Sequence, residues 1–511
     1  MFAQNPAPEI PKLVVGITID QLRGDYLEMF RHTFGNKGFN RLLNNGLVYS
    51  NVRYDFPNLD KATSITTIYT GANPFSHGII GEKKYSIEGS RELSSFFDDR
   101  YLGNYTTDKV SPFPVKVSTL TDELKIASGG QSHIFAFAPD IAQAIASGGH
   151  AADGAYWLED TKGKWATTTF YTNRQPIVDQ QNRNSQSLTY TLSGITWRPA
   201  IDIELYRAFP YTRNRYNFQH HFGSEKVNPI RLFKHSPFVN KEVNDIAMKM
   251  IESGRMGKKL NPDFIALTFY AGNYPNALDK NYSIEIQDTY YRLDQELGRL
   301  LDLLDASVGL KNCLIFLVST GYFNEQEVIP EGVATSGGDF YPDRSQALLN
   351  MYLMALYGRE QWIKQYYNRQ IFFDKKLIED KKINFAELQQ LAAEFLMQSA
   401  GIEDVVTSHQ ILHTAYDRHI QYFRNGYHKG ISGDLLLQLQ PGWQEIDPLS
   451  KERQRNCSNA MIAPLIFFGN DIKPQKVQRT VDATEIAPSV AYRLRIRAPN
   501  GAKGEILKEM Y

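Results

Sequence analysis

The stretch DFPNLDKATSITTIYTG, residues 55–71, gathers side chains that could do chemistry. Three hydroxyl residues, Thr63, Ser64 and Thr66, follow directly on Asp60 and Lys61. A hydroxyl can act as a nucleophile when a neighbouring base or metal lowers its pKa. No neighbouring residue offers a clear general base, and helix starts favour Ser and Thr for capping free amides. Capping is the expected role, and a substitute nucleophile is the alternative.

Two pairs of histidines could in principle bind metals. His409 and His413 are four residues apart, so on a helix they would share a face. The chain offers no third ligand beside them, and an exposed helix face is expected. His220 and His221 are adjacent, and neighbours on a strand point apart. They end the basic, aromatic stretch RAFPYTRNRYNFQHHF, which could bind an anionic glycan or a partner, although a surface packed by tyrosines is expected.

Composition and charge exclude several classes of protein. The chain has 511 residues, of which 42% are hydrophobic and 22% charged, as in ordinary globular proteins. Lys+Arg and Asp+Glu both number 56, so no global basic field attracts nucleic acid or an anionic membrane. The two cysteines, Cys313 and Cys457, form no CxxC pair. A cysteine zinc site is therefore not indicated.

The N-terminus points to export. No apolar run reaches the length of a transmembrane helix. The start MFAQNPAPEIPK places Phe-Ala-Gln before a proline-rich polar linker, a pattern typical of the region around an export cleavage site. We expect residues 1–11 to be a linker or signal remnant, and the protein to be periplasmic or otherwise exported.

Strand and helix patterns alternate along the chain and indicate the elements that must position these groups. KLVVGITID (residues 12–20) is typical of a central parallel strand buried on both faces. Further apolar runs predict strands at 47–55, 132–138, 263–270, 312–320 and 463–469, and residues 283–305 predict an amphipathic helix. This order predicts a doubly wound, mostly parallel α/β sheet. Such sheets bind ligands at the carboxyl ends of their strands.

We expect one α/β domain over residues 12–508 with two insertions. Residues from about 85 to 261 are rich in aromatics, Thr, Asn, Arg and Gly, which predicts a cap over the sheet edge. A second insertion is expected over about 323–430. A protein or glycan partner would bind through the cap.

Seven sequence blocks occur in one order: IDQLRGDY, RLLNNG, IYTGANPFSHGIIG, SIEIQDTYYRLD, the strand before STGY, NGYHKGISGDLLL and DATEIAPSV. Together they resemble the alkaline phosphatase superfamily, in the branch of exported type I phosphodiesterases and phosphate-irrepressible alkaline phosphatases. The resemblance runs from Lys12 to about Lys508. It implies an alkaline phosphatase-type sheet with an inserted cap.

The resemblance also implies a reaction. In that family two zinc ions, about 4 Å apart, hold a Thr or Ser nucleophile and the phosphoryl oxygens. Carboxylates and imidazoles supply the ligands. Polar and cationic side chains then stabilise the charge on the phosphoryl group.

Most positions that match this machinery carry other residues. The first metal-binding aspartate matches Asp20 and is retained. The nucleophile falls on Lys61, or on Asp60 if the loop is aligned differently. The phosphate-contacting asparagine falls on Glu82, and the phosphatase Lys-x-Arg pair falls on Asp140 and Ala142.

The later metal ligands are replaced as well. The Asp-x-x-x-His motif falls on Asn273 and Ala277, and Asp-His-Gly falls within Thr320-Gly321-Tyr322. The late histidine falls near Arg453. Of the family's ligands only Asp20 remains, and one carboxylate cannot hold two zinc ions, each of which needs about four donors. We therefore expect no metal or other cofactor.

These replacements predict a catalytically inactive, phosphatase-like protein that binds or scaffolds in the bacterial cell envelope. Lys61 would then pair with Asp20 and fill the place of the metals. Two alternatives stay open. One is an altered, metal-independent or single-metal hydrolase in the same cleft, and the other is a weak phosphomonoesterase or phosphodiesterase that binds zinc.

Overall fold

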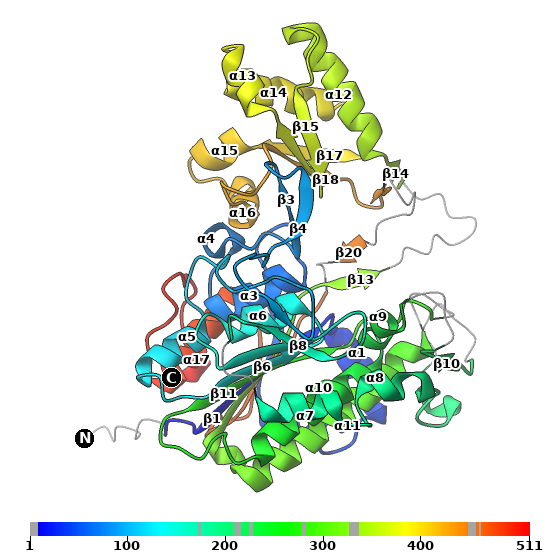
Figure 1. The fold of residues 1–511 in the computed structure, drawn as a ribbon, viewed down its shortest axis with the longest axis vertical. Coiled ribbons are helices and arrows are strands. Elements are labelled where there is room, and N and C mark those ends of the chain that lie inside the picture. Colours follow the sequence, from blue (N-terminus) through cyan, green and yellow to red (C-terminus); the bar gives the residue numbers. More distant parts are fainter. Residues whose placement is uncertain are drawn as a thin grey trace.

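The computed structural model describes residues 9–171, 175–207, 209, 216–223, 228–277, 283–325, 337–447, 456–458 and 461–511. A ten-stranded sheet runs through the lower part of the molecule (Figure 1). From edge to edge its strands are β22 (Gln475–Asp482), β2 (Leu47–Arg53), β21 (Leu465–Gly469), β12 (Cys313–Ser319), β1 (Leu13–Asp20), β11 (Asp263–Tyr270), β6 (Ile134–Ala138), β7 (Gly154–Leu158), β8 (Trp165–Thr168) and β5 (Gly103–Asn104).

Strand β1 lies in the middle of this sheet, and all eight of its residues are buried. It pairs in parallel with β11 on one side and β12 on the other. In this register Asp20 lies opposite Tyr270, and Ile19 lies opposite Ser319. The carboxyl end of β1 therefore brings Asp20 beside Thr320, the residue that follows β12.

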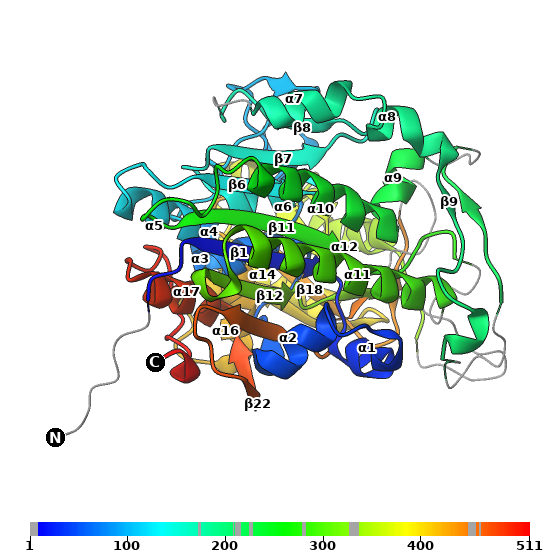
Figure 2. The same ribbon diagram turned by 90° about the horizontal axis from the view of Figure 1, so that it is seen from below.

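Helices cover both faces of the sheet (Figure 2). One face packs on α2 (Phe39–Asn45), α10 (Pro237–Glu252) and α11 (Ile284–Ser307). The other packs on α3 (Lys61–Thr70), α5 (Leu120–Ala127), α6 (Ile141–Gly148) and α17 (Ile486–Leu494). Neighbouring residues of β1 divide between the two cores, Leu13 and Val15 facing one and Val14 the other. That alternation follows from the two-residue period of a strand.

A second unit stands above the main sheet in Figure 1. Its four strands lie in the order β15 (Ile363–Tyr367), β16 (Gln370–Phe373), β18 (Leu435–Leu439) and β17 (Ile402–Thr407). Its helices are α12 (Pro342–Tyr357), α13 (Lys375–Asp380), α14 (Phe385–Leu396), α15 (Ser408–His413) and α16 (Arg418–Gly426). Trp362, Leu388 and Leu435 belong to its separate apolar core.

Shorter elements connect and flank these units. The hairpin of β3 (Lys83–Ser86) and β4 (Arg91–Ser94) lies between the main sheet and the upper unit (Figure 1). The others are α1 (Gly24–Met29), α4 (Pro74–His77), α7 (Pro176–Arg183), α8 (Leu188–Thr191), β9 (Thr196–Trp197), β10 (His220–His221), α9 (Pro229–Lys234), β13 (Phe323–Glu325), β14 (Asp339–Phe340), β19 (Gln444–Glu445) and β20 (Asn456–Ser458). Within the described residues, no helix is both long and apolar enough to cross a membrane.

The predicted fold class is confirmed: a large, mostly parallel sheet carries helices on both faces. The predicted cap over 85–261 differs from the structure, because β6, β7 and β8 fall in that range and extend the main sheet. The strand predicted at 132–138 is β6. Strands β7 and β8 have only five and four residues, too few to show a clear alternation. The insertion predicted over 323–430 corresponds to the upper unit. That unit continues past residue 430, since β18 pairs with both β16 and β17.

Candidate active site at the carboxyl edge of the sheet

Helix α3 begins at Lys61, one residue after its N-cap, Asp60. Asp60 Oδ1 accepts hydrogen bonds from the backbone amides of Ala62 and Thr63, both at 2.9 Å. Thr63 Oγ1 accepts in return from the Asp60 amide, which completes a capping box. The Ser64 hydroxyl donates to the Asp60 carbonyl. Thr63 and Ser64 thus serve the helix start, as expected from the sequence.

The Lys61 ammonium is held by two carboxylates. Its Nζ lies 2.6 Å from Asp140 Oδ2 and 3.2 Å from Glu82 Oε1. Asp140 is the N-cap of α6, and α6 packs against α3. Burial alone would lower the pKa of Lys61, but Asp140 and Glu82 outweigh it and raise that pKa well above its usual value. Lys61 therefore stays a cation and is not a neutral amine nucleophile.

Asp140 also binds a second lysine, which is buried. Lys234, the last residue of α9, places its Nζ 3.1 Å from Asp140 Oδ1 and also contacts Asp160. Burial would raise the pKa of Asp140, but Lys61 and Lys234 together hold it well below its usual range. The sequence analysis missed Lys234. The only sequence feature that points to Lys234 is its position directly after the apolar residues Leu232 and Phe233.

Asp20 is 4% exposed at the end of β1. The Thr320 hydroxyl donates to Asp20 Oδ1 at 3.1 Å. Burial raises the pKa of Asp20 to about 6, and the nearby Lys61 charge opposes that shift. The predicted Lys61–Asp20 ion pair is wrong, because the ammonium bonds to Asp140 and Glu82 instead. The Asp140 side chain, at the start of α6, lies next to the start of α3 and binds the Lys61 ammonium.

The structure brings together most of the residues singled out from the sequence, namely Asp20, Asp60, Lys61, Glu82, Asp140 and Thr320. Gly321 has a φ of 79°, and a Cβ there would lie 2.2 Å from the Tyr54 ring. Asn273 turns instead to the Asn324 carbonyl, to which its amide donates at 3.3 Å. Arg453 lies outside the described residues.

His409 and His413 lie on an exposed helix face, as expected, whereas His220 is buried rather than on the cap surface. His409 and His413 are exposed on α15 with stacked rings, and His220 Nε2 lies 3.0 Å from Glu285 Oε1. Across the described ranges, no three or more His, Cys, Asp or Glu side chains are arranged to hold a metal ion.

The side chains around Lys61 do not supply the ligands that hold two zinc ions in the family that the sequence resembles. The ammonium groups of Lys61 and Lys234 occupy the Asp140 carboxylate, and a cation donates no lone pair to a metal. That the protein binds no zinc remains a prediction.

The sheet order and the helix layers on its two faces match the alkaline phosphatase fold of a solved structure. The type I phosphodiesterase / nucleotide pyrophosphatase family model matches residues 14–460, and the chain belongs to that family.

Two related sequences and one solved structure match nearly the whole chain. A protein of Myroides odoratus named "Calcium-transporting ATPase" is 29% identical, covering 98% of this chain and 95% of its own length. Alkaline phosphatase PafA of Elizabethkingia meningoseptica is 28% identical, with 98% and 94% covered. The crystal structure of wild-type PafA aligns with a TM-score of 0.85 at 27% identity, and 99% of each chain is covered.

These comparisons contradict the prediction of a catalytically inactive binding protein. Relatives that align over the full length are named alkaline phosphatases, and nothing among them marks this branch as inactive. The replaced residues argue against catalysis only if the reaction requires two zinc ions. The alternative, a phosphoric ester hydrolase of altered activity, fits the family better.

Proposed function

We propose that this protein hydrolyses phosphate esters by an altered chemistry that uses its own lysines and Asp20. The observation that carries the proposal is the Lys61 ammonium, which lies at the start of α3 where the resembling family has its nucleophile. Lys61 and Lys234 supply positive charge for phosphoryl oxygens, the task of cationic groups in phosphoryl transfer.

A phosphate group must compete with carboxylates for Lys61. Asp140 is fixed by two lysines, whereas the Glu82 side chain is 48% exposed and can turn into solvent. A phosphoryl oxygen would then take the position of Glu82 on the Lys61 ammonium. Because phosphate must displace Glu82, we expect weaker binding and slower turnover than in an efficient phosphatase.

Asp20 is the candidate proton carrier, because a carboxyl with a pKa of about 6 can exchange protons near neutral pH. In the proposed step a water oxygen attacks phosphorus and the P–O bond to the alcohol breaks. Asp20 takes a proton from the water and returns it to the leaving alcohol oxygen. The products are inorganic phosphate, or a monoester from a diester, and the free alcohol.

The test is hydrolysis of p-nitrophenyl phosphate and bis(p-nitrophenyl) phosphate by the full-length chain. We expect turnover that survives dialysis against a chelator and rises as the pH increases through about 6. Asp20→Asn should abolish turnover, while Asp380→Asn, on the exposed surface of α13, should leave it unchanged.

Either of two results would overturn the proposal. One is no turnover of either ester above the buffer rate. The other is turnover that Asp20→Asn does not reduce, or that a chelator removes, since a contaminating zinc phosphatase behaves in that way. Export to the periplasm and a protein or glycan partner remain predictions beside this one.

A further inference from the structure

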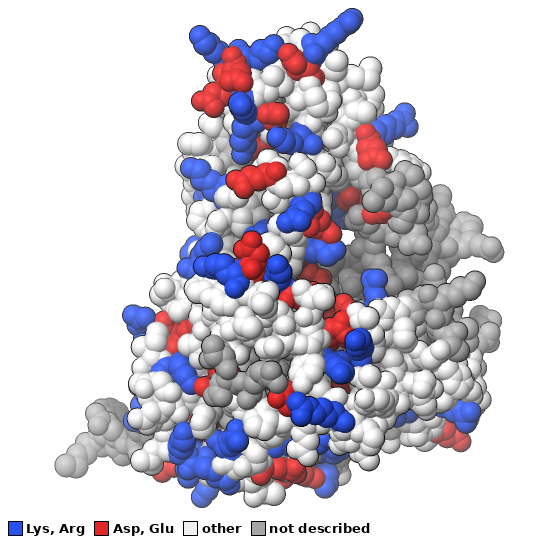
Figure 3. Space-filling model, in the orientation of Figure 1, with Lys and Arg blue, Asp and Glu red and all other residues white. Residues whose placement is uncertain are grey.

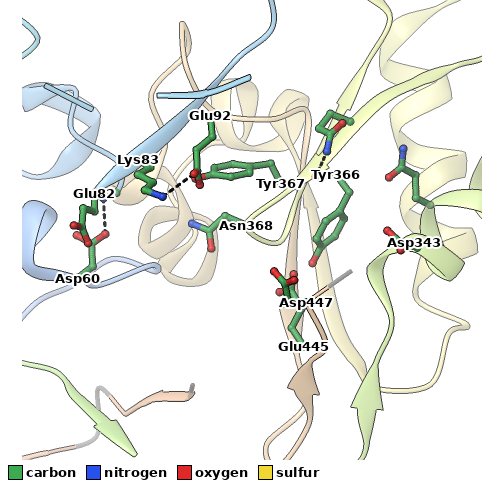
Figure 4. Close-up of a pocket in the computed structure, with 13 residues that line it drawn as sticks. Asp60, Glu82, Lys83, Glu92, Asp343, Tyr366, Tyr367, Asn368, Glu445 and Asp447 are labelled. Atoms are coloured by element: carbon green, nitrogen blue, oxygen red, sulfur yellow. Dashed lines mark hydrogen bonds and ion pairs between the residues drawn. The ribbon is translucent and has the colours of Figure 1, made fainter. Parts of the chain in front are cut away.

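Strand β3 has a different pocket on each side. Lys83 and Lys84 are neighbours on this strand, so their side chains point to opposite faces. Lys83 lines the acidic pocket of Figure 4 together with Glu82 and with Glu445 of β19, and Glu92 binds it there at 2.7 Å. Lys84 lines a smaller pocket, of about 270 Å³, on the other side of the strand.

Three segments of the chain bring basic groups to this smaller pocket. Lys84 comes from β3, and Lys116 comes from the segment before α5. His428, which follows α16, lies beside Lys116 at the end of α4. A Cβ on Gly78 would lie 3.0 Å from Lys116 Cγ and 3.6 Å from His428 Nε2. The imidazole and the lysine stem therefore meet over this glycine, whose φ is 80°.

The two lysines of the pocket are not neutralised. Within the described residues, the ammonium groups of Lys84 and Lys116 have no ion pair or hydrogen bond. Asp98 also lines the pocket, but its two oxygens already bind Arg100, each at 2.8 Å. Asp99, the other carboxylate of the lining, is exposed to solvent.

The basic groups repel one another. Burial and the Lys116 charge lower the pKa of Lys84. Burial also lowers the pKa of His428, and the charges of Lys116 and Lys84 add to the shift. No carboxylate of the described residues opposes either shift, so a bound anion would relieve the repulsion. Acidic and basic side chains are interspersed on the face of the molecule in Figure 3, which makes an uncompensated pair of lysines a local feature.

His428 also offers a hydrogen-bond donor. The Gly430 amide donates to His428 Nδ1 at 3.4 Å. Because Nδ1 is thus an acceptor, the proton of the neutral ring is on Nε2. Across the part of the chain that the structure describes, this Nε2–H has no acceptor.

Two ammonium groups and one N–H donor match an oxyanion that carries two negative charges. Such an anion neutralises both lysines and accepts the imidazole proton in a charge-assisted hydrogen bond. Phe97 and Phe113 add apolar surface to the same pocket. We propose that this pocket binds a phosphate dianion, either as inorganic phosphate or as the phosphate group of an organic ester. The site lacks Lys61 and Asp20, so it is separate from the candidate active site.

The test is calorimetric titration of the full-length chain with inorganic phosphate and with phenyl phosphate at about pH 7.5, where a phosphate ester is mostly a dianion. We expect saturable binding that weakens as salt is added. Lys84→Gln should weaken it by about tenfold, because the half-buried ammonium is poorly screened, and Lys116→Gln should weaken it severalfold. Lys116 is exposed, so its variant should fold even if the Lys84 variant does not.

The two titrants distinguish the sources of the phosphate group. Tighter binding of phenyl phosphate would identify an organic ester as the ligand, with its ring against Phe97 or Phe113. Equal binding of the two would identify inorganic phosphate. Either result supports the proposal.

Lys376→Gln, on the exposed side of α13, is the matched control and should bind phosphate like the parent chain. The proposal is overturned if neither titrant saturates, or if Lys84→Gln and Lys116→Gln bind as tightly as the control. It is also overturned if acetate displaces phosphate at equal concentration, because a single negative charge would then suffice.

A further variant separates this site from the candidate active site. Binding should survive Lys61→Met, which removes the ammonium at the start of α3, and a complete loss of phosphate binding in that variant would overturn the proposal. Ester hydrolysis is measured separately, so the failure of either proposal leaves the other standing.

Discussion

Lys61 Nζ lies 2.6 Å from Asp140 Oδ2, although 79 positions separate the two residues in the chain. Each sits at the start of a helix, Lys61 on α3 and Asp140 as the N-cap of α6. Lys234 binds the other oxygen of the same carboxylate. One partly buried anion thus pairs with one partly buried and one buried cation at the carboxyl edge of the sheet.

This arrangement predicts unequal costs for removing its members. Asp140→Asn leaves two largely buried lysines without their shared anion, and we expect it to lower the free energy of unfolding by about 3 kcal/mol. Lys61→Met leaves Asp140 paired with Lys234, so its cost should be smaller. Denaturant titration of both variants, with Asp380→Asn as the surface control, measures the difference. Equal losses for the two variants would contradict the shared-anion arrangement.

Asp20 predicts a pH-dependent stability. Its pKa is raised by burial from 3.8 to about 6, so the folded state binds the proton more tightly than the unfolded state. The protein therefore loses stability as the pH rises from about 4 to about 6. Asp20→Asn removes this loss of stability. A pKa shift of roughly two units corresponds to about 3 kcal/mol of unfolding free energy at neutral pH.

We expect Asp20→Asn to raise the melting temperature at about pH 7.5 and to change it little at about pH 4. Thermal unfolding across that pH range checks both halves of the prediction. If the variant is less stable than the parent at neutral pH, the ionised Asp20 is stabilised by a partner in the folded protein, and the prediction fails.

Glu82 predicts a gain in phosphate binding. Its carboxylate lies 3.2 Å from Lys61 Nζ, where a phosphoryl oxygen would have to sit. Glu82→Gln removes one negative charge from a half-exposed ion pair, a change worth up to about 1 kcal/mol. Inorganic phosphate should then bind up to about fivefold more tightly, as measured by calorimetry. Glu379→Gln is the control, and tighter binding in both variants would point to net charge alone.

The donor set predicts the metal content. After incubation with zinc and desalting, mass spectrometry of the intact chain should find well under one zinc ion per protein, because each site needs about four donors. Near two ions per chain would mean that residues outside the described part complete a metal site. The proposed metal-independent step would then be abandoned.

Much of the fold could be predicted from local patterns. The sequence of each segment alone indicates the continuous apolar run of β1, the helix closed before Gly46 and the amphipathic α11. The boundary of the upper unit could not be predicted in this way. Its strand β18 pairs with β16 and β17, from which helices separate it in the chain, and a strand's own residues do not show which strands it pairs with.

The candidate site, like the fold, could be predicted only in part from the sequence. The sequence by itself determined which residue types stand at its edge. Asp20 ends a recognisable strand, Lys61 and Asp140 lie at helix starts, and Glu82 directly follows the block IYTGANPFSHGIIG. Only the tertiary structure decided that Lys61 pairs with Asp140 rather than Asp20. It also decided that Lys234 joins them and that β19 completes an acidic pocket. An ion pair depends on distances of a few ångströms between separate segments, and only the packing of helices on the sheet sets those distances.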